Sequence, residues 1–110
     1  MQISKQTVVV LVAFAFFILA PNTLKAAEDG AALYKTKCAV CHGPDGGGKP
    51  ALKAPSLVSD EAKKMSDDEL TDMIANGGKD KKATHAFSKK GVTAEQIKSL
   101  VAYIRDLQKK

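Results

Sequence analysis

Apolar residues recur at helical spacing near the end of the chain, and they predict a C-terminal helix. Successive members lie three or four residues apart, so they would share one helix face. They are Ile97, Leu100, Val101, Ile104 and Leu107. Thr93 precedes this stripe, and Gln96 follows it three residues later, which is the capping-box pattern of a helix start. We therefore predict a helix from Thr93 to the end.

A second segment, Ser66 to Asn76, carries the same signals. Ser66 and Glu69 form a capping box, and Gly77 with Gly78 would end the helix. Its apolar face is formed by Leu70, Met73 and Ile74. A third helix is predicted over about residues 28–40, where acidic residues suit a helix N-terminus. Between them, residues 43–60 hold many Gly and Pro and predict a loop. The fold class is therefore all-α, with no convincing strand.

The N-terminus has the features of a secretory signal peptide. Lys5 precedes an unbroken apolar run, Val8 to Ala20, and Pro21 breaks it. The run is shorter than the roughly 20 residues of a membrane span. We expect cleavage after Ala26, which gives a signal peptide at 1–26 and one domain at 27–110. The protein would then be periplasmic and would meet the membrane only if the segment stayed uncleaved as an anchor.

Charge and aromatic content argue against a nucleic-acid-binding protein. The chain has 17 Lys and Arg and 12 Asp and Glu, and removing Lys5 and Lys25 leaves 15 − 12 = +3. The lysines are scattered among acids rather than clustered with aromatic residues. The expected domain keeps only Tyr34, Phe87 and Tyr103 as aromatics. So small a chain has a limited core, which a large apolar cofactor would extend.

Both cysteines lie in one pentapeptide, Cys38-Ala39-Val40-Cys41-His42. This C-x-x-C-H string is typical of c-type haem attachment. Two thiols three residues apart on a helical turn share one face, so both can reach the vinyl groups on one edge of a porphyrin. His42 would supply an imidazole to the iron. The pattern predicts one covalent haem c, held by Cys38 and Cys41.

The cysteine pair has three other interpretations. A thioredoxin-like redox disulfide expects a βαβ context, which the sequence lacks. A zinc site would need His85 as well, because there is no third Cys. A structural disulfide closing so short a loop would add little stability. The adjacent His42 and the predicted export favour haem.

From about residue 28 onward the chain resembles a class I monohaem cytochrome c of the small bacterial, c6/c5-like kind. The resemblance implies that the N-terminal helix, with Gly30 and Tyr34, crosses the C-terminal helix at Leu100 and Tyr103. Pro55-Ser56-Leu57 resembles the Pro-x-Leu segment of that family. It implies that the Pro55 carbonyl accepts the Nδ1–H of His42 and fixes its tautomer, and that Leu57 contacts the haem.

The distal side departs from the family, which carries Met-Pro-Ala-Phe before the last helix. This chain has Thr84-His85-Ala86-Phe87, so Thr84 takes the Met position and His85 lies one residue away. We predict His85 as the distal iron ligand, because neutral imidazole binds iron well. The alternatives are Met73, Met65, a lysine of the 79–82 run, or an open site.

The expected function is one-electron transfer with redox partner proteins, by a monomer that has no enzymatic substrate and no nucleic-acid partner. Two imidazole ligands would give a lower reduction potential than Met/His ligation. An open or weakly held site would instead bind small gases or peroxide. Five lysines flank the His85 loop: Lys79, Lys81, Lys82, Lys89 and Lys90. They either form a docking rim for acidic partners or are an ordinary solvated loop, and Asp80 among them favours the second interpretation.

Overall fold

The computed structural model describes residues 23–110, and these form an all-α fold around one core. The predicted signal residues Lys5, Val8–Ala20 and Pro21 lie outside this range. The α-helices are α2 Thr23–Lys37, α3 Ala39–His42, α4 Asp60–Lys64, α5 Asp67–Asn76 and α6 Ala94–Gln108. Two 3₁₀ turns, η1 Pro50–Leu52 and η2 Phe87–Lys90, complete the order. Within 23–110 there is no strand, and the only β-type pairing is the bridge between Lys49 and Ala54.

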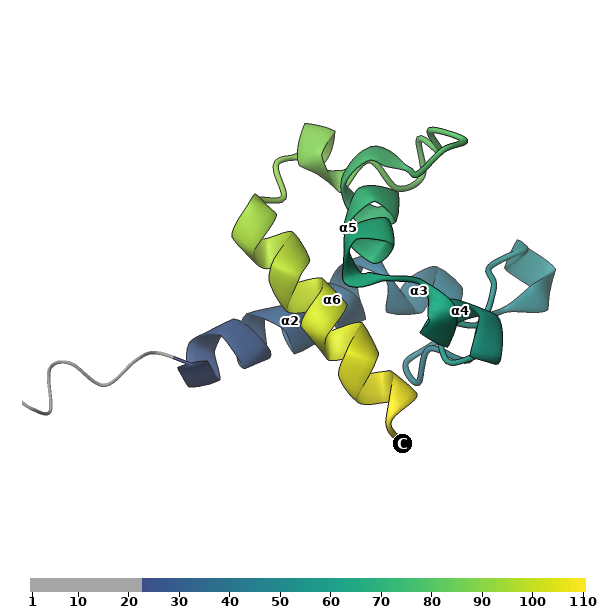
Figure 1. Ribbon diagram of the computed structural model, residues 1–110, viewed down its shortest axis with the longest axis horizontal. Helices are drawn as coiled ribbons and strands as arrows, with labels where there is room; N and C mark the ends of the chain where they lie inside the picture. Colours follow the sequence, from purple (N-terminus) through teal and green to yellow (C-terminus); the bar gives the residue numbers. More distant parts are fainter. Residues whose placement is uncertain (1–22) are drawn as a thin grey trace, which may run out of the picture.

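The two terminal helices cross, as the resemblance implied, with α2 passing behind α6 in Figure 1. Gly30 allows the close approach, because a Cβ there would lie 2.9 Å from the carbonyl carbon of Ser99. Tyr34 and Leu100 are almost wholly buried, and the ring centroids of Tyr34 and Tyr103 are 5.2 Å apart. Close backbone contact and aromatic packing therefore hold this crossing together.

Helix α5 stands beside α6 and begins where the sequence predicted (Figure 1). The Ser66 hydroxyl accepts a hydrogen bond from the Glu69 N–H at 3.1 Å, and the Glu69 carboxylate accepts one from the Ser66 N–H at 2.8 Å. Thr93 and Gln96 make the same reciprocal pair at the start of α6. Both capping boxes are therefore confirmed. They satisfy N–H groups that have no partner inside their helices.

Two predicted boundaries were wrong. Helix α2 begins at Thr23 rather than near Glu28, and it ends at Lys37 rather than at Val40. It therefore spans Ala26, where cleavage stays a prediction. The segment 43–60, predicted as a loop, contains η1, and α4 starts at its last residue. With five residues, α4 is too short for a detectable apolar period; its start is marked only by Ser59, whose side chain accepts from the Ala62 N–H.

The core joins α2, α5, α6 and the turn before α6. Its buried residues include Tyr34, Leu70, Ile74, Phe87 and Leu100. Among the described residues, no helix is both long enough and apolar enough to span a membrane. The core leaves the pentapeptide and the loop bearing His85 beside the helix pair, where they form the site.

Candidate functional site

The pentapeptide begins directly after α2: Cys38 is the N-cap of α3, and its other four residues, Ala39–His42, form α3. The Cys41 and His42 N–H groups both donate to the Cys38 carbonyl, at 3.1 and 2.9 Å, so one helical turn carries both thiols. Cys38 is buried and Cys41 is exposed, and both thiols are free. Burial raises the pKa of the Cys38 thiol to about 11, against a smaller opposing effect of Lys37. Cys38 is therefore a protonated, unreactive thiol at neutral pH, which does not suit a redox disulfide.

His42 is held in one orientation by the loop opposite. It is 8% exposed, and its Nδ1 lies 2.9 Å from the Pro55 carbonyl oxygen. A carbonyl can only accept, so Nδ1 carries the hydrogen and Nε2 keeps its lone pair. This is the contact that the resemblance implied, and it leaves His42 prepared to bind a metal through Nε2.

Gly48 lies against the backbone of the loop that contains Pro55. Its φ is +85°, and a Cβ there would lie 2.8 Å from the Ala54 carbonyl oxygen and 2.9 Å from the Pro55 carbonyl carbon. The Gly48 N–H also donates to the His42 carbonyl at 2.7 Å. Only glycine combines this backbone conformation with such a close approach. Gly48 therefore brings His42 and Pro55 together.

His85 faces His42. The two ring centroids are 6.1 Å apart and the ring planes differ by 11°. Two imidazoles bound to opposite sides of one first-row metal ion, with metal–nitrogen bonds of about 2 Å, have their ring centres about 6 Å apart. The observed ring separation matches this value. Thr84, which takes the family's Met position, is exposed and contributes its carbonyl to a hydrogen bond from Lys90 at 3.1 Å.

The environment of His85 keeps its ring neutral. Burial lowers the pKa of His85, and the nearby His42, Lys82 and Lys90 lower it further. Its Nδ1 is buried with no hydrogen-bond partner, so the structure gives His85 no counterpart of the Pro55 carbonyl. The neutral imidazole keeps a lone pair with which it can bind a metal ion.

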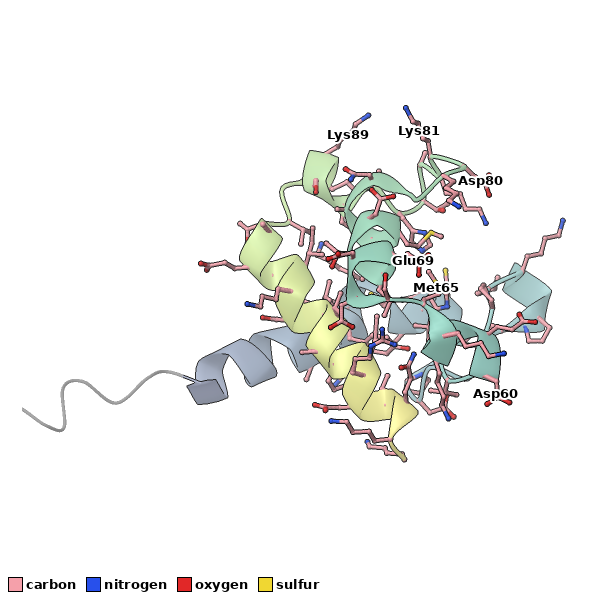
Figure 2. All side chains as sticks on the ribbon, viewed as in Figure 1. Asp60, Met65, Glu69, Asp80, Lys81 and Lys89 are labelled. Carbon is pink, nitrogen blue, oxygen red and sulfur yellow. The ribbon has the colours of Figure 1, made fainter. Side chains whose placement is uncertain are left out.

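The other distal candidates are placed differently. Met65 packs against the core at the junction of α4 and α5 (Figure 2). The Met73 side chain packs against Gly78, since a Cβ added at Gly78 would lie 3.1 Å from the Met73 sulfur. Lys79, Lys81 and Lys82 are exposed, and Figure 2 shows Lys81 and Lys89 pointing outward from two different segments. His85 is the candidate whose ring pairs with that of His42.

Leu57 and three contacts that were not predicted from the sequence remain to be placed. Leu57 is partly buried and packs against the core, and its haem contact stays a prediction. Sequence reasoning missed the hydrogen bond from the Tyr34 hydroxyl to the Gly43 carbonyl. It also missed the contact of Lys90 with the Phe87 ring and the pairing of Arg105 with Gln108. The Tyr34 contact depends on how separate segments pack, whereas the other two join residues three apart on one helical element.

A protein-family model described as cytochrome c oxidase, cbb3-type, subunit III matches residues 25–104. The chain belongs to this family. The cbb3-type subunit III family is a family of c-type cytochromes, so the cofactor is covalently bound haem c, and two cysteines suffice for one. A search of curated proteins finds no match.

The residues present fit that cofactor. Two thiols lie on one helical turn, His42 keeps the lone pair of Nε2, and a second imidazole ring lies 6.1 Å from it, centroid to centroid. The zinc alternative gains no support, because residues 23–110 contain no group of three or more His, Cys, Asp or Glu side chains able to hold a metal ion. The site thus agrees with membership of the cbb3-type subunit III family.

Proposed function

We propose that this protein is an exported one-electron carrier with a bis-histidine haem. In this proposal Cys38 and Cys41 hold one haem c through thioether bonds, and His42 and His85 bind its iron. Pro55 fixes the tautomer of His42, and Leu57 packs against the haem. The cofactor supplies the Fe(III)/Fe(II) couple, while the chain supplies the ligands, the burial and the orientation, with no substrate chemistry of its own.

The observation that carries this proposal is the facing pair of imidazoles. His42 and His85 come from distant parts of the sequence, yet their rings are nearly parallel and 6.1 Å apart. Direct stacking of the rings would bring His85 atoms against His42. The observed separation supports the proposal, because two imidazole ligands of one metal ion have similar ring spacing. Two imidazoles stabilise Fe(III) relative to a Met/His pair, so we expect a lower reduction potential than in Met-ligated relatives.

The carrier function is tested on the purified holoprotein. We expect haem to stay attached on a denaturing gel, and Cys38→Ala and Cys41→Ala each to weaken or abolish that attachment. A redox titration should show one reversible one-electron step with low-spin spectra in both states. Loss of haem from the wild type under denaturing conditions, or a high-spin spectrum in either state, would refute the proposal.

Location, partners and oligomeric state form part of the proposal. We expect the exported form to begin at Ala27, to reside in the periplasm as a monomer, and to exchange electrons with redox partner proteins. The five flanking lysines, all exposed, would face an acidic partner if they form a docking rim. The mass of the periplasmic protein tests the first point, because an anchor would retain residues 1–26.

A second candidate function is the binding of small neutral gases such as carbon monoxide. The observation that favours it is the unpaired Nδ1 of His85, because a ligand without an orienting hydrogen bond is bound less firmly. Rapid binding of carbon monoxide by the reduced wild type would support this function. A reduced spectrum that stays unchanged under carbon monoxide would exclude it and leave the carrier.

A further inference from the structure

The end of α6 reaches the loop that orients His42. Gln108 donates from Nε2 to the Leu57 carbonyl at 2.8 Å, and it accepts at Oε1 from Arg105 Nη1 at 2.8 Å. Leu57 follows Pro55 by two residues. The C-terminal helix therefore contacts the backbone of the segment whose Pro55 carbonyl holds His42.

Arg105 is itself fixed by two other segments. Its Nε forms an ion pair with Asp67 at 2.8 Å, and its Nη2 donates to the Met65 carbonyl. Asp67 is largely exposed, so this ion pair adds little stability. Its effect is directional, because a guanidinium held at Nε and Nη2 presents Nη1 in one fixed position. Both polar atoms of the Gln108 side chain are therefore held, Oε1 by Arg105 and Nε2 by the Leu57 carbonyl.

The far side of the same loop is equally constrained. The Leu57 N–H donates to the Gly46 carbonyl at 2.7 Å, and Gly48 lies against the backbone of Pro55. The Pro55 carbonyl therefore lies between the Lys49–Ala54 bridge and the glycine-rich turn on one side and the segment that Gln108 contacts on the other. Removing Gln108 would leave the Leu57 carbonyl without its side-chain donor and would free this end of the loop from α6.

We propose that Gln108, oriented by Arg105, is a positioning residue for His42, because it keeps the Pro55 carbonyl aligned with the Nδ1–H. The inference rests on the proposed function, in which His42 binds iron. A strong Nδ1–H···O bond makes the imidazole a better donor to the metal, and so stabilises Fe(III). Loosening the loop therefore raises the reduction potential, although Gln108 itself does not touch His42.

The test uses the holoprotein variant Gln108→Ala, which leaves the net charge unchanged. We expect a higher reduction potential than in the wild type. We also expect the His42 Nδ1–H to exchange with solvent several-fold faster by NMR, the roughly five-fold factor of one net hydrogen bond. Arg105→Lys, which keeps the charge but loses the fork, should shift both in the same direction by less.

Ile97→Val is the matched control. It removes core packing on the same helix, at a residue 2% exposed, without touching the loop. We expect it to lower stability and to leave the potential and the exchange rate unchanged. An unchanged potential in Gln108→Ala, or an equal shift in Ile97→Val, would overturn the inference while the wild-type bis-histidine spectrum still supports the proposed function. A wild type without histidine-ligated iron would overturn both.

Discussion

Replacing Gly30 with Ala tests the helix crossing that supports the site. A methyl group at this position would enter the backbone of Ser99 on α6, with the carbonyl carbon at 2.9 Å and the carbonyl oxygen closer still. No side-chain rotation relieves a clash with backbone. The helices α2 and α6 must separate by several tenths of an ångström, and that loosens the packing of Tyr34 and Leu100.

Two opposing effects set the magnitude. Overpacking a well-packed contact costs about 1–3 kcal/mol, and a backbone clash belongs at the upper end. Ala is a better helix former than Gly by about 1 kcal/mol. We therefore expect Gly30→Ala to lower the free energy of unfolding by about 2 kcal/mol. For a domain of this size that corresponds to a fall in Tm of roughly 8–16 °C.

The assay is thermal unfolding of the oxidised holoprotein, followed by far-UV circular dichroism. Ala32→Gly is the matched control, because Ala32 is exposed on the same helix and reports helix propensity alone, with a loss of about 1 kcal/mol. If Gly30→Ala were as stable as the wild type or more stable, propensity would dominate, and the close approach of α2 to Ser99 would be wrong.

Further predictions concern the caps and the buried tyrosine. Ser66→Ala should cost about 1 kcal/mol through the lost cap, as measured by urea unfolding. Hydrogen bonds from the Ser66 backbone and side chain lower the pKa of Glu69, so its contribution to stability is present above the unfolded pKa of about 4.3. That contribution is lost as the pH falls below this value. In Ser66→Ala the free energy of unfolding should therefore fall less steeply with decreasing pH than in the wild type. Tyr34→Phe should cost about 1 kcal/mol, because the Gly43 carbonyl keeps its bond from the Gly46 N–H; a loss above 3 kcal/mol would contradict this. Burial, with a smaller effect of Cys38, raises the pKa of Tyr34 to about 12. Any stability from its neutral form is therefore complete below pH 10 and lost towards pH 12, and ultraviolet titration should show no Tyr34 phenolate at pH 10.

Local signals predicted α5 and α6 well. The boxes at Ser66 and Thr93 combine a cap, a return hydrogen bond and an apolar stripe within one turn, so neighbouring residues suffice to specify them. The end of α2 was misplaced, because the helix-compatible sequence continues through Cys38 while the structure turns there to start α3. Helix α4 was missed because five residues carry no period.

The site was predictable where chemistry is encoded in adjacent residues, as in the pentapeptide. On the distal side, alignment placed Thr84 at the family's ligand position, and His85 was predicted instead because it is the other imidazole of the chain. The structure turns the chain at Ala86, whose φ is +49°, and the His85 N–H bonds to the Lys82 carbonyl. It is His85 that then faces His42. The contact of Gln108 with Leu57 joins residues far apart in sequence, so no local pattern could indicate it.

The most direct test of the account is the identity of the second iron ligand. Near-infrared and EPR spectra of the ferric holoprotein should be recorded for the wild type, His85→Ala and Thr84→Ala. We predict a low-spin bis-imidazole signature in the wild type and in Thr84→Ala, because Thr84 is exposed and lies outside the gap. We predict its loss in His85→Ala. If His85→Ala kept the wild-type low-spin signature, His85 would not be the ligand, and the central claim would be contradicted.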